Sequence, residues 1–174
     1  AVSIYYTEDH MRVLMLTQFY PPIIGGEERH VKTLSHQLAK RGHEVFVVTL
    51  WREGLPEFEQ EGAVQVFRVR GTLARMSWLF VDSADRRHAP PFPDPEITFS
   101  LRRLVNQIKP DIAHAHNWIV HSYLPLKNSS GVPLVLSLHD YGIRCAIKRL
   151  MYRHAVCSGP GVAKCLNCAS EHYG

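Results

Sequence analysis

The sequence predicts an α/β fold, a Rossmann-like open parallel sheet with helices on both faces. Three observations predict this class. Short apolar runs alternate with amphipathic helical stretches, as in βαβ units. A pair of glycines separates the first apolar run from the first helical stretch, and polar residues follow the later runs. The chain has 174 residues, 45% hydrophobic and 21% charged, which suits one well-cored domain.

The first strand, helix and second strand form a single βαβ unit. Residues 11–17 (MRVLMLT) make an apolar run typical of a strand buried on both faces. Apolar residues recur at helical spacing from Val31 to Leu38, and Gly42 follows as a helix stop. The next apolar run, 45–50, follows so closely that we expect a parallel strand joined by a right-handed crossover.

Gly25 and Gly26 stand at the carboxyl end of the first strand and the amino end of the first helix. Backbone N–H groups and the positive end of the helix suit an anion there, typically a phosphate. Glycine also lets the backbone approach a ligand closely. A tight turn alone explains the pair equally well. The G-x-G-x-x-G and phosphate-loop patterns are missing from the sequence, which disfavours nicotinamide, flavin and P-loop enzymes.

The middle of the chain is less regular. Residues 51–62 are expected to form a charged loop, and the alternating run 63–69 a strand near a sheet edge. Residues 71–93 form a long irregular stretch, which in a compact domain is either a solvated loop or functional. This stretch carries three arginines: Arg75, Arg86 and Arg87.

The second half returns to regular elements. Asp94 and Pro95 are a strong helix start, and the helix is expected to end near Ile108. We expect a strand at 111–116, a helix from Ile119 to about Lys127, and a central buried strand at 132–138. These bounds follow from the apolar patterns alone.

Histidines follow both later strands. His114 and His116 share one face of their strand; they are either metal ligands or a strand-end pair satisfied by backbone and water. The apolar run at 132–138 brings His139 and Asp140 to its carboxyl end, where ligands bind in open α/β sheets. A structural contact between His139 and Asp140 is the alternative interpretation.

All four cysteines lie in the segment 145–168. Cys165 and Cys168 have the C-x-x-C spacing of metal ligands, and Cys145 and Cys157 precede them. A structural zinc site, reduced thiols and disulfides all remain open, with zinc favoured over disulfides in a cytosolic protein. His154 and His172 are alternative ligands.

The net charge of +4 comes from scattered basic residues, which weakly supports an anionic ligand and argues against nucleic acid. No apolar segment reaches the roughly 20 residues of a membrane span. Residues 1–10 lack the apolar core of a signal peptide, so we interpret them as a loose extension or a cloning remnant. A cytoplasmic location is expected, with peripheral membrane contact still open.

Several motifs occur in a fixed order: Phe-Tyr-Pro-Pro at 19–22, Gly-Gly-Glu at 25–27, Arg-Gly-His-Glu-Val at 41–45, then the His-x-His and Leu-His-Asp segments. In this order they resemble the amino-terminal domain of family 4 glycosyltransferases, which are retaining enzymes of the two-domain GT-B fold. The resemblance covers residues 11–174. It implies that this chain is the acceptor-side half and that a carboxy-terminal donor domain is absent from it.

The resemblance also implies a function. The expected reaction transfers a sugar from a nucleoside-diphosphate sugar to a sugar, lipid or small-molecule acceptor with retention of configuration. No cofactor or metal is expected for catalysis, and this half alone is expected to be catalytically silent. The alternative is a non-catalytic binding or regulatory module, because fold alone does not establish function.

The resemblance further implies roles for individual residues. His116 and His139 are expected beside the reacting carbon, and Gly25 and Gly26 beside the donor diphosphate. Further candidates for the cleft follow from their positions next to these motifs: Glu27, His30, Asn117, Asp140 and Tyr141. In GT-B enzymes the region corresponding to residues 71–93 often helps cover the acceptor, so the resemblance makes its three arginines weak candidates for contacts to an acidic acceptor. Many family members also carry a similar cysteine-rich insert after the His-Asp-Tyr segment.

Overall fold

A computed structural model of the chain describes residues 10–72, 89–142 and 144–173. The expected amino-terminal extension, apart from its last residue, lies outside the described residues. So do the three arginines considered as acceptor contacts, Arg75, Arg86 and Arg87.

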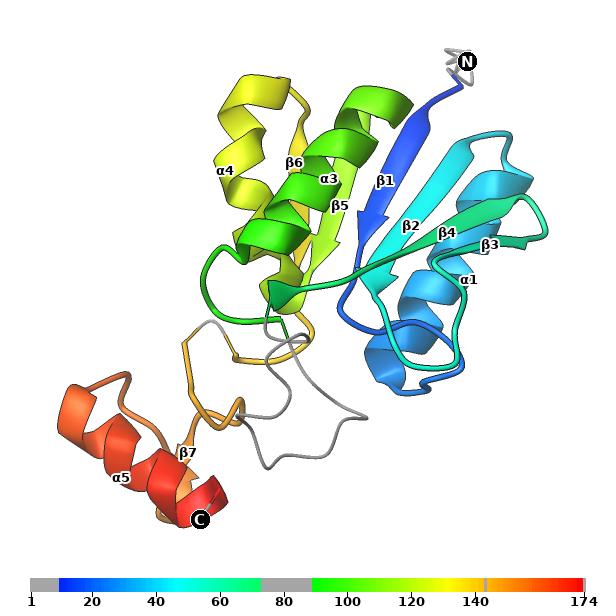
Figure 1. Ribbon diagram of the computed structural model, residues 1–174. Helices are drawn as coiled ribbons and strands as arrows, with labels where there is room; N and C mark the ends of the chain where they lie inside the picture. The colour runs from blue at the N-terminus through cyan, green and yellow to red at the C-terminus, as the bar shows by residue number, and fades with distance from the viewer. Residues whose placement is uncertain (1–9, 73–88, 143, 174) are drawn as a thin grey trace, which may run out of the picture.

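A six-stranded sheet forms the centre of the protein, in the order β3-β4-β2-β1-β5-β6 (Figure 1). Five strands are parallel, and β3 runs antiparallel to β4 at one edge. The strands are β1 (Arg12–Leu16), β2 (Glu44–Leu50), β3 (Phe58–Glu61), β4 (Val64–Val69), β5 (Ile112–His116) and β6 (Leu134–Ser137). The predicted α/β class, with a Rossmann-like parallel sheet, is confirmed.

Helices cover both faces of the sheet (Figure 1). Helix α1 (Gly26–Lys40) packs on one face through Val31, which is fully buried among the valines of β1, β2 and β4. Helices α3 (Pro95–Ile108) and α4 (Val120–Ser130) pack on the other face in the larger core cluster. A 3-10 turn, Asn117–Ile119, precedes α4.

Helix α3 begins where the sequence predicted, because Asp94 caps it. The Asp94 carboxylate accepts the N–H groups of Glu96 and Ile97, which the helix itself leaves without partners. It also accepts both the N–H and the hydroxyl of Thr72. The cap therefore ties the start of α3 to the segment that follows β4.

The predicted charged loop at 51–62 is wrong in part, because Phe58–Glu61 forms the edge strand β3. The rings of Phe58 and Phe67 face each other across the β3–β4 pair with centroids 5.1 Å apart. Strand β3 carries only one apolar side chain, and that side chain is 49% exposed. Its pairing comes from β4 rather than from burial, so an apolar pattern could not reveal it.

The predicted central position of the strand at 132–138 is also wrong. Strand β6 is the last in the sheet order, and Val135, Leu136 and Leu138 are 44%, 39% and 55% exposed. The continuous apolar run suggested burial on both faces. The position of a strand within the sheet is set by its pairing partners, which composition does not encode.

The cysteine-rich segment forms a small unit beside the sheet domain, and we call residues 144–173 the cysteine lobe. It holds a two-stranded hairpin, β7 (Met151–Tyr152) and β8 (Ala155–Val156), and helix α5 (Val162–Tyr173). The lobe projects away from the carboxyl edge of the sheet (Figure 1). In the part of the chain that the structure describes, no helix is both long enough and apolar enough to cross a membrane.

Candidate active site

The candidate site lies where the strand order reverses. The chain builds outward from β1 through β2 to β4 and then returns to place β5 on the other side of β1. Such a reversal opens a crevice at the carboxyl ends of the strands, where α/β proteins bind ligands. The pairs Leu16–Ala115 and His116–Ser137 align the ends of β1, β5 and β6 at this edge.

Two histidines meet at this edge. His116 Nδ1 lies 2.8 Å from His139 Nε2, and their rings are stacked with centroids 5.1 Å apart. His116 is fully buried, whereas His139 is exposed. His30, in the first turns of α1, adds a third ring 5.3 Å from that of His139. His114 stacks beside His116 at 4.3 Å, as expected for residues on one face, and its Nε2 contacts Ser137 Oγ at 2.8 Å.

Burial keeps His116 uncharged. Desolvation, followed by the nearby His114, His139 and His30, lowers the pKa of His116 to about 3. At neutral pH its ring therefore carries one N–H, and the contact with His139 uses one donor and one acceptor. The second ring nitrogen, Nε2, is buried with no partner among the described residues. Such a group is an exception among buried polar atoms.

Asn117 joins three elements of the site. Its Nδ2 donates to Glu27 Oε2 at 2.5 Å, and its Oδ1 accepts the backbone N–H of His139 at 3.2 Å. The residue is 5% exposed and has a φ of 55°, a conformation that asparagine tolerates better than most residues. Asn117 thus fixes the end of β5 to α1 and to the segment that follows β6.

Glu27 completes the network from the first turn of α1. Thr17, directly after β1, donates its hydroxyl to Glu27 Oε1 at 3.1 Å. Desolvation raises the pKa of Glu27, and the carboxylates of Glu28 and Asp140 raise it further. The hydrogen bonds from Thr17 and Asn117 oppose this shift by stabilising the ionised form.

The two glycines differ in what surrounds them. A Cβ at Gly25 would collide with the buried carboxylate of Glu28 and lie 3.3 Å from its Cδ. At Gly26 a Cβ would meet no described atom within 4 Å. Gly25 is the N-cap residue of α1, and no side chain caps this helix. An added Cβ at Gly25 would therefore press on the end of the Glu28 side chain, whereas the space beside Gly26 is open.

The segment after β6 is a turn fixed by its own side chain. Asp140 Oδ1 accepts the N–H of Gly142 at 2.7 Å. A Cβ at Gly142 would come within 2.9 Å of Trp118 Nε1, so this turn fits closely against the 3-10 turn. Tyr141 is 56% exposed. The side chain of Tyr141 is therefore available to a ligand at the sheet edge, whereas Asp140 is occupied in holding the turn.

The structure brings together most of the residues that the sequence singled out. His116, His139, Asn117, Glu27 and His30 form one connected group, and Gly25 and Gly26 begin the helix that holds Glu27 and His30. The cysteines stand apart in the lobe. Sequence reasoning missed Thr17 and Ser137, whose only signal is a hydroxyl at the end of an apolar run.

Comparison with known proteins is consistent with this geometry. An uncharacterised glycosyltransferase of Methanocaldococcus jannaschii is 34% identical over 140 residues, covering 78% of this chain and 33% of that protein. A glycogen synthase of Mycobacterium tuberculosis is 29% identical over 146 residues, covering 74% and 33%. A solved sucrose-phosphate synthase from Thermosynechococcus elongatus shares the fold, with a TM-score of 0.55, 12% identity, and coverage of 77% of this chain and 34% of that one.

The mostly parallel sheet, with its strand order reversing beside β1 and helices on both faces, defines an open α/β domain. Residues 24–158 match the family model described as Glycosyltransferase Family 4. The chain therefore belongs to glycosyltransferase family 4. It spans about a third of the length of the curated relatives that it matches.

Proposed function

We propose that the chain forms the acceptor-side part of an enzyme that transfers a sugar from a nucleoside-diphosphate sugar to an acceptor, with retention of configuration. The single observation that carries this proposal is the uncapped amino end of α1 beside the network of Glu27, Asn117 and His139. An anion site and a set of polar side chains then share one edge of the sheet.

The donor diphosphate would face the amino end of α1. The first backbone N–H groups of a helix lack partners within the helix, and no side chain caps this one. The open space over Gly26 lets a phosphate approach the backbone. These N–H groups would stabilise the negative charge that grows on the diphosphate as it leaves. The Glu27 carboxylate is held in its own hydrogen bonds to Thr17 and Asn117, which reduces its opposition to an anion.

The acceptor would face His139. Of the two stacked histidines only His139 is exposed, so it is the one that can touch a substrate. Its backbone is held by Asn117 and its ring by His116. His116 then acts through His139 as a positioning residue. This divides the two roles that the sequence analysis assigned jointly to the pair.

Retention of configuration is compatible with a diphosphate at the amino end of α1 and an acceptor at His139. It requires that the incoming acceptor oxygen bond to the face of the sugar that the diphosphate leaves. The diphosphate and the acceptor therefore belong on the same side of the reacting carbon. The amino end of α1 and His139 do lie on one edge of the sheet, with Glu27 and Asn117 linking them.

A screen of nucleoside-diphosphate sugars against the full-length protein that carries this chain tests the proposal. The readouts are release of nucleoside diphosphate in the presence of candidate acceptors and the anomeric configuration of the product by NMR. We expect one donor class to be turned over with retention, and His139→Ala to lower turnover by about 100-fold. Turnover with inversion, or no turnover with any donor, would overturn the proposal.

A further inference from the structure

The cysteine lobe lacks a core of its own. No described side chain in residues 144–172 is buried, and Val156 and Val162 are 82% and 83% exposed. Units of this size, about 30 residues, cannot bury enough apolar surface to fold and usually depend on a metal or on cross-links. The hairpin and helix α5 therefore need a source of stability other than apolar packing.

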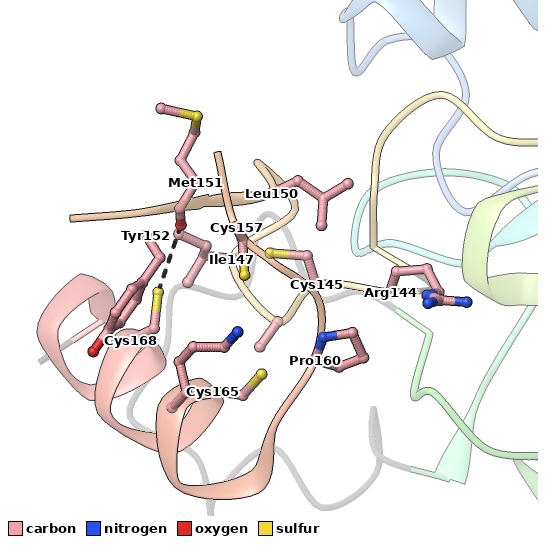
Figure 2. A pocket seen from close by; sticks show the side chains of 12 residues that line it. Arg144, Cys145, Ile147, Leu150, Met151, Tyr152, Cys157, Pro160, Cys165 and Cys168 are labelled. Atoms are coloured by element: carbon pink, nitrogen blue, oxygen red, sulfur yellow. Dashed lines mark hydrogen bonds between the residues drawn. The ribbon is translucent and has the colours of Figure 1, made fainter. Parts of the chain in front are cut away.

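The four cysteines supply a common centre for the lobe. They come from three segments: the turn before β7, the residue after β8, and two turns of α5. Their side chains lie between the hairpin and α5, with Cys168 turned toward the carbonyl of Met151 (Figure 2). All four line one small cavity of about 20 Å³, which is space for a single water-sized body. The four residues are Cys145, Cys157, Cys165 and Cys168, and none is in a disulfide.

Backbone groups contact three of the sulfurs. The N–H of Gly161 donates to Cys165 Sγ at 3.4 Å, and the sulfurs of Cys157 and Cys168 face the carbonyls of Gly159 at 3.4 Å and Met151 at 3.9 Å. N–H groups turned toward sulfur stabilise the thiolate, which is the form that binds metals. Cys165 and Cys168 lie three residues apart on one face of α5, so both reach the same side of the helix.

The cysteine lobe has more basic than acidic side chains, which favours a metal bound by several thiolates. Its only carboxylate side chain is Glu171. Its basic side chains are Arg144, Lys148, Arg149, Arg153 and Lys164. Four thiolates around one divalent cation carry two excess negative charges, and such a centre is favoured by cationic surroundings.

We propose that Cys145, Cys157, Cys165 and Cys168 bind one zinc ion as a tetrathiolate site that holds the cysteine lobe together. Four sulfur ligands from a single centre are the preferred set of a structural zinc site. Among the described residues, no three side chains of His, Cys, Asp or Glu already stand at coordination spacing. Binding therefore draws the hairpin and α5 together, so the order of the lobe depends on the metal.

The site sits beside the candidate active site in the chain. The N–H of Cys145 donates to the carbonyl of Tyr141 at 2.8 Å, and Lys148 Nζ lies 3.9 Å from Asp140 Oδ2. One hydrogen bond thus joins the first proposed ligand, Cys145, to the turn after β6, and the ion pair of Lys148 ties the same two segments. Zinc is a structural element in this proposal, and no catalytic step depends on it.

The test measures metal content directly. The protein is purified under reducing conditions without added metal or chelator and analysed for zinc and iron. We expect about one zinc per chain, as in structural sites generally. Cys165→Ser should lose most of the metal, whereas the matched exposed substitution Leu166→Ser, one residue along α5, should keep it.

A second measurement covers loss of metal during purification. Zinc is removed with a strong chelator, and the reduced protein is digested with trypsin before and after zinc is returned. Zinc should slow cleavage inside 144–173 by tenfold or more and leave cleavage of the sheet domain unchanged, because the lobe lacks any other core. Cobalt in place of zinc should give the visible absorption of a tetrahedral thiolate site.

Other outcomes would overturn the proposal. These are iron in place of zinc, disulfides among the four cysteines in protein purified without reductant from the cytoplasm, or no zinc uptake by the reduced protein with unchanged proteolysis. Equal metal content in Cys165→Ser and Leu166→Ser would also overturn it.

Discussion

At the scale of single residues, burial separates the two histidines of the site. His139 is exposed and can contact a ligand, whereas His116 is fully buried and contacts His139 with one ring nitrogen. The lowered pKa of His116 follows from this burial. A buried neutral histidine has a direct consequence for stability, because unfolding exposes it to water and lets it take up a proton.

We predict that the acid sensitivity of the protein depends on His116. Its pKa is about 3 when folded and 6.5 in the reference state. Between these values the unfolded chain binds the extra proton, so stability falls as pH falls below 6.5 and is unaffected above it. One such group changes the free energy of unfolding by at most about 1.4 kcal/mol per pH unit.

Urea denaturation at pH 7, 6 and 5 measures this slope. His116→Gln should lower the slope of the unfolding free energy against pH by the amount that one titrating group contributes. The part of the slope that comes from His114 should remain, because burial also lowers the pKa of His114. Ile119→Val, another fully buried change, should lower stability by about 1 kcal/mol at every pH and keep the slope. An unchanged slope in His116→Gln would contradict the account.

The two adjacent glycines give a second prediction at this scale. Gly25→Ala pushes against the buried Glu28 carboxylate and should lower stability by about 1 kcal/mol. A Cβ at Gly26 would enter open space, so Gly26→Val should leave the melting temperature of the full-length protein within a few degrees of the parent. Its turnover should nevertheless fall on the order of 100-fold, because the side chain would occupy the space in which we propose that the diphosphate binds.

Thermal melts and turnover on both variants decide this prediction. We expect Gly26→Val to lose more activity than stability. A Gly26→Val protein that melts early but whose folded fraction is fully active would assign both glycines to the turn alone.

At the scale of elements, one side chain connects three pieces of secondary structure. Asn117 holds the end of β5 against α1 through Glu27, and against the segment after β6 through the N–H of His139. The contact between Asn117 and Glu27 joins residues 90 positions apart in the sequence. It links the position of α1 to that of β5 at the edge where the candidate site lies.

A double-mutant cycle tests this connection. Asn117→Asp places a second carboxylate against Glu27 and should cost about 1–3 kcal/mol of stability at pH 8. The cost should shrink as pH falls, because the pair can then share a proton. Glu27→Gln alone should be mild, since a rotated amide still serves both Asn117 and Thr17.

The combined variant should recover most of the loss, because the new amide of residue 27 can donate to the new carboxylate of residue 117. A coupling free energy of about 1 kcal/mol or more, measured by chemical denaturation, is expected for a direct contact. Additive losses would show that the two side chains do not support each other in solution.

Local sequence signals predict some of the helices and strands and not others. The apolar runs predicted β1, β2, β4 and β5, and the Asp94 cap predicted the start of α3, because these signals are local. Strand β3 was missed because its pairing with β4 supplies what its sequence lacks. Strand β6 was misplaced because its position depends on which neighbours it finds.

The features of the candidate site also fall into two groups, those that local motifs predict and those that depend on distant segments. The histidines, Asn117 and the glycines follow local motifs and were singled out from the sequence. The bond between Glu27 and Asn117 and the burial of His116 arise from distant segments that meet only in the folded chain. The position of Glu28 beneath Gly25 also could not be predicted, since nothing in the sequence states which way that side chain turns.

At the scale of the whole molecule, the sheet domain and the cysteine lobe have different physical bases. Two apolar clusters on opposite faces of the sheet stabilise the domain. The lobe has no buried side chain among its described residues and is attached next to the turn that follows β6. The candidate active site lies at the edge of the stable part, so its geometry rests on the sheet and α1.

The central claim is that the amino end of α1 receives the donor diphosphate. The most direct measurement is an NMR titration of the 174-residue chain, labelled with nitrogen-15, with nucleoside diphosphates. We expect amide shifts to concentrate at Gly25, Gly26 and Glu27 and to be lost in Gly26→Val. The dissociation constant should be roughly millimolar, equivalent to about 4 kcal/mol, because the site is open to water and salt. Shifts confined to other parts of the chain, or binding that Gly26→Val leaves intact, would contradict the account.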